Sequence, residues 1–338
     1  MAKVTILGGG SWGIALAVLL HNNGHDVTIW SAVPAEYEML KDTHEHKMLP
    51  GVKLAEDMHF TLDENEAVEG KDVVIMAVAS SYTRVTAARF SKWIAPGQKI
   101  VNVAKGIEEN TLMTLSEIIE QEIPQADVAV LSGPSHAEEV SRGLPTTVVV
   151  AAKSKASAEY LQNLFMSEVF RVYISPDILG IELGGALKNV VALAAGIADG
   201  LGYGDNTKAA LITRGIAEIA RLGIAMGGKF ETFCGLTGIG DLIVTCASMH
   251  SRNRRAGILI GQGKTMQEAM DEVKMVVEGV YSAKAAMALS KKYNVQLPII
   301  EQVNAVLFDG KSAEQAVKEL MLRDKKIEIA DELWEKQS

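Results

Sequence analysis

Short runs of apolar and β-branched residues recur through the first half of the chain and predict a series of β-strands. The runs lie at residues 3–7, 24–30, 72–78, 99–103, 128–131, 146–150 and 170–174. They lack strict alternation of apolar and polar residues, which is typical of strands in a mainly parallel sheet covered on both faces. Helical periodicity fills the intervals, for example around residues 83–93 and 112–120. The first half is therefore predicted to be an α/β unit.

The pattern becomes helical after the last of these runs. Ser175-Pro176-Asp177 is typical of a helix start and marks an expected domain boundary, with residues 1–177 forming one domain and residues 178–338 another. Periodic apolar segments then follow at residues 209–226, 265–277, 282–292 and 312–322. The second domain is therefore predicted to be all-helical.

The longest apolar stretch, residues 181–201, has the length of a membrane span. It is interrupted by Glu182, Lys188 and Asp199, whereas a span of this length usually carries few charges or none. We therefore expect a buried core helix and no membrane insertion.

A glycine-rich turn follows the first predicted strand and precedes a helical stretch. Gly8, Gly10 and Gly13 match the pattern G-x-G-x-x-G, with Ser11 and Trp12 between the last two glycines. In this motif the first glycine permits a tight turn, the second lets the backbone approach a pyrophosphate, and the third allows close packing of helix on strand. The helix N-terminus adds free N–H groups and its positive dipole end. Strand, turn and helix in this order predict a Rossmann-type, doubly wound dinucleotide-binding domain.

The end of the second predicted strand bears on the choice of dinucleotide. An enzyme strict for NAD usually carries an acid there, bonded to the ribose 2′-OH, but this chain has Ser31-Ala32-Val33-Pro34. No arginine stands in that segment to hold a 2′-phosphate, although Ser31 offers a hydrogen bond and Lys41 follows nearby. The cofactor is therefore predicted to be NADPH or NADH, and we favour NADPH because the acid is absent.

Composition narrows the class of protein. With 338 residues the chain is long enough for two domains, and its 48% hydrophobic and 22% charged residues are typical of a soluble globular protein. The net charge of -9 argues against binding to nucleic acid. Cys234 and Cys246 offer neither a disulfide framework nor the spacing of a metal site, and the first strand leaves no room for a signal peptide. We expect a cytoplasmic protein that holds no metal.

Lys188 is the first candidate for chemistry, because it lies near the start of the long apolar stretch. Burying an unpaired ammonium group is costly, so a lysine here needs a partner or a function. A lysine that snorkels from the edge of a core helix is the structural alternative. Lys105 directly follows the fourth predicted strand, at the sheet edge where such folds bind ligands, and an exposed loop lysine is the alternative there.

Three further segments offer polar groups for a small anionic substrate. Gly133 and Ser135 lie in the loop after the fifth predicted strand. Asp241 lies in a glycine-rich turn, where capping of a helix is its structural alternative. Ser251-Arg252-Asn253-Arg254-Arg255 offers hydroxyl, guanidinium and amide groups suited to a phosphate, and for its last two residues we expect a solvated helix start.

Together these segments resemble a known family. The glycine-rich turn, Ala104-Lys105-Gly106, residues 132–135, 184–189, 238–241 and 251–255, and Val277-Glu278-Gly279 are similar in order and spacing to bacterial NAD(P)-dependent glycerol-3-phosphate dehydrogenases. Each motif alone is weak, but jointly they are specific and cover nearly the whole chain. The resemblance implies an oxidoreductase that interconverts dihydroxyacetone phosphate and sn-glycerol 3-phosphate by hydride transfer with NAD(P)H. It also implies a role in supplying glycerol 3-phosphate for phospholipid synthesis.

The resemblance also implies roles for individual residues. Lys188 matches the catalytic lysine, which accepts a proton during oxidation of glycerol 3-phosphate and donates one during reduction of dihydroxyacetone phosphate. Lys105 and Asp241 complete the expected catalytic set: Asp241 would orient Lys188, and Lys105 would stabilise the oxyanion. The expected substrate-binding residues are Lys105, Gly133, Ser135, Lys188, Asp241, Ser251, Arg252 and Asn253. The expected cofactor-binding residues are Gly8, Gly10, Ser11, Trp12, Gly13, Lys105, Ala137, Arg252, Val276 and Glu278.

Three segments depart from the family pattern. Ser31-Ala32 replaces the positively charged or His-containing segment often found after the second strand. His136 stands where the family often has an aromatic or a small residue, and Met48-Leu49-Pro50 replaces an aromatic-Leu-Pro pattern near the adenosine end. The first departure leaves the relative preference for NADP and NAD open.

Two other functions fit parts of the pattern. A reductase of a β-hydroxyacid or a sugar-acid phosphate also pairs a G-x-G-x-x-G domain with a helical domain that carries an active-site lysine. A non-catalytic dinucleotide sensor is the second alternative. Residues 104–106 and 251–253 argue against the first, and the intact set of Lys105, Lys188 and Asp241 argues against the second. The expected ligand is a small phosphorylated molecule, and the apolar helices of the second domain are compatible with a homodimer.

Overall fold

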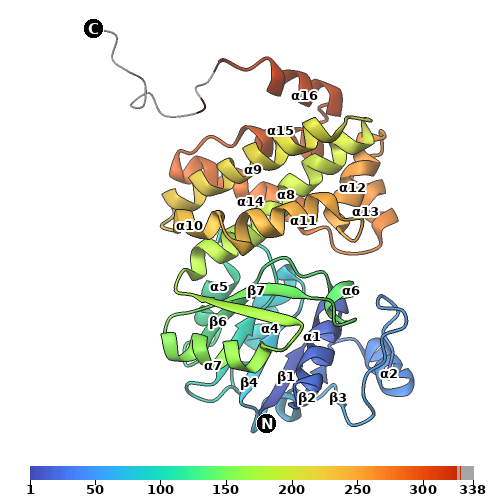
Figure 1. Cartoon of the computed structure of the whole chain (residues 1–338), viewed down its shortest axis with the longest axis vertical. Helices are drawn as coiled ribbons and strands as arrows, with labels where there is room; N and C mark the ends of the chain where they lie inside the picture. Colours follow the sequence, from blue (N-terminus) through green and yellow to red (C-terminus); the bar gives the residue numbers. More distant parts are fainter. Residues whose placement is uncertain (326–327, 329–338) are drawn as a thin grey trace.

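The structure is a computed structural model that describes residues 1–325 and residue 328. One eight-stranded sheet lies in the first half of the chain and a stack of helices forms the second half (Figure 1). The strands are β1 (Lys3–Leu7), β2 (Asp26–Trp30), β3 (His59–Thr61), β4 (Val73–Met76), β5 (Lys99–Asn102), β6 (Asp127–Ser132), β7 (Thr146–Ala152) and β8 (Phe170–Ser175). The predicted α/β fold with an all-helical second half is confirmed.

The order of the strands shows where a ligand can bind. The sheet has the order β3-β2-β1-β4-β5-β6-β7-β8, and neighbouring strands are parallel except for the antiparallel pair β6 and β7. The chain winds outward in one direction from β1 to β3 and in the other from β4 onward. In such doubly wound sheets the crevice at the carboxyl ends of the strands beside this reversal is the usual ligand site.

The sequence pattern found every strand except β3. This strand is three residues long, and His59-Phe60-Thr61 contains no apolar run. It pairs only with β2, at the edge of the sheet. Edge strands of this length are held by tertiary context, so their sequence gives little signal.

Helices cover both faces of the sheet. They are α1 (Ser11–Asn22), α2 (Pro34–Thr43), α3 (Glu64–Val68), the short turn η1 (Ser80–Tyr82), α4 (Thr83–Phe90), α5 (Leu115–Glu122), α6 (Ala137–Val140) and α7 (Lys155–Phe165). Successive residues of β4 point to opposite faces: Ile75 belongs to the core beneath α1 and α7, and Val74 to the core beneath α3, α4 and α5. Burial on both faces explains why the strands read as continuous apolar runs.

The described part of the second half is helical between residues 178 and 321. Its elements are α8 (Ile178–Gly200), α9 (Asp205–Ala225), α10 (Phe230–Phe233), the short π-helical turn η2 (Leu236–Gly240), α11 (Asp241–Ala247), α12 (Arg252–Gly261), α13 (Met266–Val273), α14 (Glu278–Tyr293), α15 (Pro298–Phe308) and α16 (Ala313–Met321). The predicted helix at residues 265–277 is too long, because α13 ends at Val273 and the next residue, Lys274, has a left-handed φ of 55°. A left-handed residue of this kind is a common helix stop.

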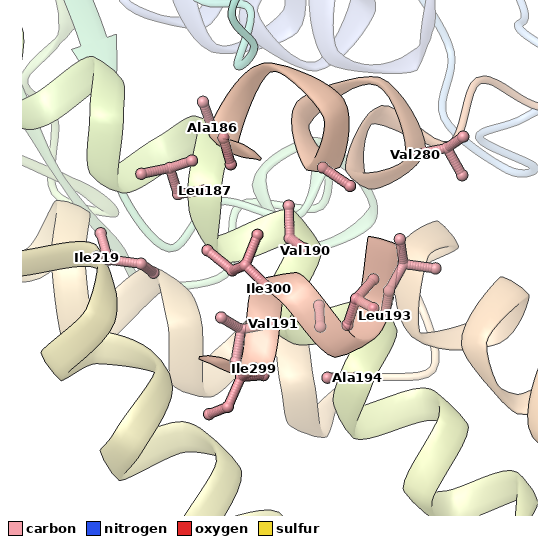
Figure 2. Packing of buried hydrophobic residues seen from close by; sticks show 14 of the residues in the cluster. Ala186, Leu187, Val190, Val191, Leu193, Ala194, Ile219, Val280, Ile299 and Ile300 are labelled. Atoms are coloured by element: carbon pink, nitrogen blue, oxygen red, sulfur yellow. The ribbon is translucent and has the colours of Figure 1, made fainter. Parts of the chain in front are cut away.

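Helix α8 is the centre of the helical half. Leu187, Val190 and Val191 point toward Ile300 of α15 and Ile219 of α9, as Figure 2 shows. The helix is long and apolar enough to cross a membrane, as is the segment 230–247, but 89% of the apolar window of α8 is buried inside the protein. The expected core helix is therefore observed. Its start is fixed by Asp177, whose carboxylate accepts a hydrogen bond from the Gly180 N–H at 3.0 Å.

Close contact between α8 and α12 brings two functional segments together. A Cβ atom on Gly196 would lie 2.1 Å from the carbonyl oxygen of Arg254, and one on Gly257 would lie 2.3 Å from that of Leu193. Only glycine permits this approach. The N-terminal turn of α12 therefore lies beside the middle of α8, where Lys188 is found.

Candidate active site

Three ionisable side chains meet where the two halves of the chain touch. Lys188 Nζ of α8 donates to Asp241 Oδ1 at 2.5 Å, and Lys105 Nζ, from the loop after β5, donates to Asp241 Oδ2 at 2.6 Å. Lys105 also donates to the carbonyl oxygen of Gly133 at 2.9 Å, in the loop after β6. One carboxylate thus joins two lysines that are far apart in the sequence. We call Lys105, Lys188 and Asp241 the lysine–aspartate cluster.

The cluster is buried, and burial changes its protonation. Lys188 is 5% exposed and Asp241 is 1% exposed. Burial lowers the pKa of Lys188 to about 7, with a contribution from the charge of Lys105, although Asp241 opposes the shift. Burial alone would raise the pKa of Asp241, but the two lysines lower it overall. An amine that titrates near neutral pH beside a carboxylate that stays ionised is suited to proton transfer.

Thr245 is a member of this site that the sequence did not reveal. Its hydroxyl lies one helical turn after Asp241, accepts a hydrogen bond from Lys188 Nζ at 2.7 Å and donates to the Asp241 carbonyl oxygen at 2.6 Å. Two oxygen partners therefore fix the position of the Lys188 amine. The i, i+4 spacing from Asp241 is the signal that could have identified Thr245.

A chain of amide hydrogen bonds positions the neighbouring residues. Asn253 Nδ2 of α12 donates to Asn189 Oδ1 of α8 at 2.9 Å, and the N–H of Gly279 at the start of α14 donates to Asn253 Oδ1 at 2.8 Å. Asn189, which directly follows Lys188, was not singled out from the sequence. Ser251 caps α12 by accepting from the Arg254 N–H at 3.2 Å. Three helices are thereby locked together around Lys188.

A cavity of about 330 Å³ opens onto the cluster. Ten of the residues predicted from the sequence line it, namely Ser11, Trp12, Lys105, Ser135, Ala137, Lys188, Ser251, Arg252, Asn253 and Glu278. Asp241 and Gly133 lie behind the wall, where they hold the lysines. Val276 is not among the lining residues, and its neighbour Met275 is. A larger, mainly apolar cavity of about 590 Å³ lies between α8, α9, α15 and α16 and includes neither lysine.

The glycine-rich turn reaches this cavity at Ser11 and Trp12, which line it, whereas Gly8, Gly10 and Gly13 are not among the lining residues. Gly8 has a left-handed φ of 122°, and a Cβ atom on Gly13 would lie 2.2 Å from the Gly8 carbonyl oxygen. At Gly10, by contrast, a Cβ atom would meet nothing within 4 Å in the described chain. No side chain of the described residues caps α1, and its first turn contains no acid. Free N–H groups facing open space fit the pyrophosphate of a dinucleotide.

Arg252 and Glu278 lie along the same cavity. No hydrogen bond or ion pair within residues 1–325 and 328 ties down the Arg252 guanidinium. Burial lowers the pKa of Arg252, while Glu278 and Glu138 oppose the shift. Glu278 of α14 accepts hydrogen bonds from the Ser80 N–H at 3.1 Å and from the Ser80 hydroxyl, so it links the helical half to the sheet. A half-buried guanidinium without a hydrogen bond or ion pair among the described residues is suited to an anionic ligand.

The structure corrects the interpretation of Arg254 and Arg255 as a solvated helix start. Neither residue is exposed. Arg254 pairs with Asp199 Oδ2 of α8 at 2.8 Å, and Arg255 lines the cavity with an Nε that has no partner among the described residues. The alternative considered for Asp241 was also wrong, because this residue is the first residue of α11 and not its cap.

His136 also lines the cavity and keeps a buried Nε2 without a partner among the described residues. Its ring lies 5.7 Å from that of His250. Burial lowers the pKa of His136, as do the charges of Lys188 and Lys105, while Glu138 and Asp241 oppose the shift. A neutral imidazole therefore faces the cavity. Within the described ranges, no group of three His, Cys, Asp or Glu side chains is arranged to hold a metal ion.

Comparisons with known proteins agree with this arrangement. A model of the N-terminus of NAD-dependent glycerol-3-phosphate dehydrogenase matches residues 3–158, and a model of the C-terminus of the same enzyme matches residues 177–318. A glycerol-3-phosphate dehydrogenase [NAD(P)+] of Agathobacter rectalis is 65% identical over 335 residues, which cover 99% of this chain and 100% of that protein. One of Fusobacterium nucleatum is 62% identical over 97% of this chain and 99% of that protein. The crystal structure of a glycerol-3-phosphate dehydrogenase from Coxiella burnetii, 36% identical, superposes with a TM-score of 0.92 and covers 95% of this chain and 99% of that chain.

Proposed function

We propose roles for these residues from one premise: the chain belongs to the NAD-dependent glycerol-3-phosphate dehydrogenase family and interconverts dihydroxyacetone phosphate and glycerol 3-phosphate with NAD(P)H. The observation that carries the assignment of roles is the buried amine of Lys188, held between Asp241 and Thr245 and facing the cavity. The other roles follow from what lies around that amine.

Lys188 is the proton donor and acceptor. A bound nicotinamide supplies or accepts the hydride at C2 of the substrate. During reduction the carbonyl oxygen becomes an alkoxide, which takes a proton from the Lys188 ammonium group, and during oxidation the neutral amine takes the hydroxyl proton. A pKa of about 7 makes both forms of Lys188 available near neutral pH.

Asp241 and Lys105 set the electrostatics of this transfer. Asp241 accepts from both amines and keeps Lys188 pointed into the cavity. Lys105 places a second positive charge at the cavity wall, where it stabilises negative charge that develops on the substrate oxygen. Because the two lysines share one carboxylate, the site carries a net positive charge when Lys188 is protonated. That charge suits a phosphorylated substrate.

The substrate phosphate is bound at the start of α12. Arg252 offers a guanidinium without a partner among the described residues, and Ser251, Asn253 and Ser135 line the same cavity. Gly133 acts through its carbonyl oxygen, which holds Lys105. Binding energy from the phosphate then positions the carbonyl group against Lys188.

The dinucleotide is bound along the glycine-rich turn. Gly8, Gly10 and Gly13 shape the turn, and the N-terminus of α1 at Ser11 and Trp12 faces the cavity. Ala137, Arg252 and Glu278 line the same cavity, as does Lys105 of the lysine–aspartate cluster. Met275 lines the cavity and its neighbour Val276 does not, so the geometry does not support the cofactor contact expected of Val276. We therefore propose residues 1–177 as the dinucleotide-binding domain and residues 178–338 as the catalytic domain, of which residues 326–327 and 329–338 lie outside the described residues.

The wider assignment rests on the family. We propose that the protein acts in the cytoplasm, supplies glycerol 3-phosphate for phospholipid synthesis and forms a homodimer. The role in phospholipid synthesis can be tested in cells with and without the protein. Label from dihydroxyacetone phosphate is followed into the precursors of polar lipids and compared between the two.

The replacement Lys188→Met tests the central role. Methionine keeps the length and apolar volume of the lysine stem but cannot carry a proton. We expect kcat for reduction of dihydroxyacetone phosphate to fall by about 10²–10⁴-fold, the usual contribution of a general acid. Absorbance of the reduced cofactor gives the rate. Titration of the protein with the reduced cofactor gives the dissociation constant of that cofactor, which we expect to be unchanged.

Lys291→Met is the matched control, because this lysine of α14 is exposed and lies outside the cavity. It should keep full turnover. If Lys188→Met retained most of its turnover while still folded, another group would have to hold the proton, and the proposed role of Lys188 would be wrong.

A further inference from the structure

The carboxylate of Glu36 lies against the glycine-rich turn. A Cβ atom on Gly9, the residue between the first two glycines of the motif, would lie 2.6 Å from Glu36 Oε2. Glu36 belongs to the first turn of α2, immediately after β2. The end of β2 is where a doubly wound fold binds the adenosine ribose. An acid therefore stands at the ribose site although none stands in Ser31-Ala32-Val33-Pro34.

Two neighbours fix the position of Glu36. The hydroxyl of Ser31, which is 2% exposed, donates to Glu36 Oε2 at 2.6 Å. His46 Nε2 lies 3.8 Å from Glu36 Oε1. Burial alone would raise the pKa of Glu36, but His46, Ser31 and the charge of Lys47 lower it overall. The group is an ionised carboxylate at neutral pH, held by partners that leave it facing the turn.

Two of the positive groups near Glu36 that could serve a 2′-phosphate are engaged elsewhere, while a third, Lys47, is exposed. Lys41, which the sequence offered for this purpose, is exposed and lies over the Tyr37 ring at 5.5 Å. His46 serves as the partner of Glu36. The spacing points the same way, because the acid that bonds the ribose 2′-OH in this fold usually follows the turn by about 20 residues. Glu36 stands at about that distance past Gly13.

We propose that Glu36 makes this protein select NADH over NADPH, by accepting a hydrogen bond from the ribose 2′-OH and by repelling a 2′-phosphate. This proposal rests on the dinucleotide site described above. It reverses the preference for NADPH that we drew from the missing acid after β2. The acid is present, but it is supplied one helical turn later in the chain.

Direct binding of the two reduced cofactors tests the proposal without turnover. Titration of the wild-type protein should give a dissociation constant for NADH that is lower than that for NADPH by about 100-fold, because juxtaposed like charges cost several kcal/mol at close range. Glu36→Gln keeps the shape of the side chain and its acceptor for Ser31 but removes the charge. We expect this variant to reduce the ratio of the NADPH and NADH dissociation constants by at least about tenfold, mainly through tighter binding of NADPH.

Glu38→Gln is the matched control. Glu38 lies on the same helix and carries the same charge, but it is exposed. Its replacement should leave the ratio of the two dissociation constants unchanged. Because Glu36→Gln could disturb the local fold, thermal unfolding of both variants is measured alongside, and the wild-type ratio alone is a test that needs no variant.

Two results would overturn the proposal: a wild-type protein that binds NADPH as tightly as NADH, or a folded Glu36→Gln variant with an unchanged ratio. Initial rates with dihydroxyacetone phosphate test the assigned reaction separately from the role of Glu36. If neither cofactor supported turnover while NADH still bound more tightly, the assigned reaction would fail and the role of Glu36 would stand.

Discussion

At the glycine-rich end of the cavity the protein offers backbone and open space, whereas at the other end it offers three ionisable side chains held against one another. A Cβ atom on Gly10 would meet no described atom within 4 Å, while Asp241 holds two amines at 2.5 and 2.6 Å. The first end comes from one continuous segment after β1. The second is assembled from the loop after β5, from α8 and from α11.

This difference separates binding from chemistry. A backbone cradle with no charged side chain can hold a phosphate group without taking part in proton transfer. A buried cluster of two lysines and one aspartate can move a proton, but its charges must be closely paired, because an unpaired charge in this position is costly. Changes at the two ends should therefore alter different quantities: dissociation constants at the glycine end and turnover at the lysine end.

The largest effect is expected from Asp241→Asn. Asparagine keeps the shape but offers one oxygen in place of the two that Lys105 and Lys188 use. We expect kcat to fall by about 10²–10⁴-fold, since the proton donor loses its orientation and its charge partner. The melting temperature should fall as well, because two buried amines lose their counter-ion. Steady-state rates and thermal unfolding measure both.

Asp199→Asn is the matched control on the same helix as Lys188. Asp199 also bridges two cations, Lys208 at 2.9 Å and Arg254 at 2.8 Å, but it lies outside the cavity. It should lower the melting temperature and leave kcat nearly unchanged. If both replacements reduced turnover equally, the cluster would act only through stability and not through chemistry.

A pair of alanine replacements sharpens the contrast at the glycine end. Gly10→Ala adds a methyl group that meets no described atom, on a backbone with φ of -69° that alanine readily adopts. We expect the melting temperature to stay the same and the dissociation constant of NADH to rise about tenfold, because only a bound pyrophosphate would feel the methyl group. Titration and thermal unfolding give the two quantities.

Gly13→Ala should lower both stability and affinity, because its methyl group would lie 2.2 Å from the Gly8 carbonyl oxygen and force the turn to shift. The two variants thus distinguish space kept for the ligand from space needed by the fold. If Gly10→Ala bound NADH as tightly as the wild-type protein, the open space at Gly10 would not be part of the dinucleotide site.

The sequence predicted the strand, turn and helix at the glycine end because their signal is local. The strand, the glycines and the helix lie within residues 3–22, and each glycine has its own steric reason. The same local reasoning did not point to Glu36, which we propose as the acid at the ribose. The rule places the acid at the end of β2, and only tertiary structure shows that Glu36 of α2 reaches back to Gly9.

The lysine end was predicted only in part. Lys105, Lys188 and Asp241 were singled out individually, but nothing in their spacing shows that one carboxylate bridges both amines. Asn189 was missed because an asparagine in a helix carries no distinctive pattern, and Thr245 was missed although it lies at i, i+4 from Asp241. Their roles depend on how α8, α11 and α12 pack, which in turn depends on glycines such as Gly196 whose purpose is visible only in three dimensions.

The smallest expected effect is a pH dependence that belongs to the lysine end alone. The pKa of Lys188 lies at about 7 and not at its ordinary 10.5. In the proposed role of Lys188, reduction needs the protonated amine, so kcat for dihydroxyacetone phosphate should be constant at lower pH and fall as the pH rises through about 7. One pH unit higher, about a tenth of the amine stays protonated, and kcat should fall accordingly. Oxidation needs the neutral amine and should show the opposite trend.

The neighbours of Lys188 determine where this transition lies, and each should move it in a known direction. Lys105 lowers the pKa of Lys188, so Lys105→Met should shift the transition to higher pH in whatever turnover remains, whereas Asp241 raises it, so Asp241→Asn should shift it to lower pH. Gly10→Ala should leave it in place, since no charge changes at the glycine end. A wild-type curve that stays flat through pH 7 and falls only near the ordinary lysine pKa would mean that burial does not govern this amine. The distinction between a binding end and a proton-transfer end would then lose its electrostatic basis.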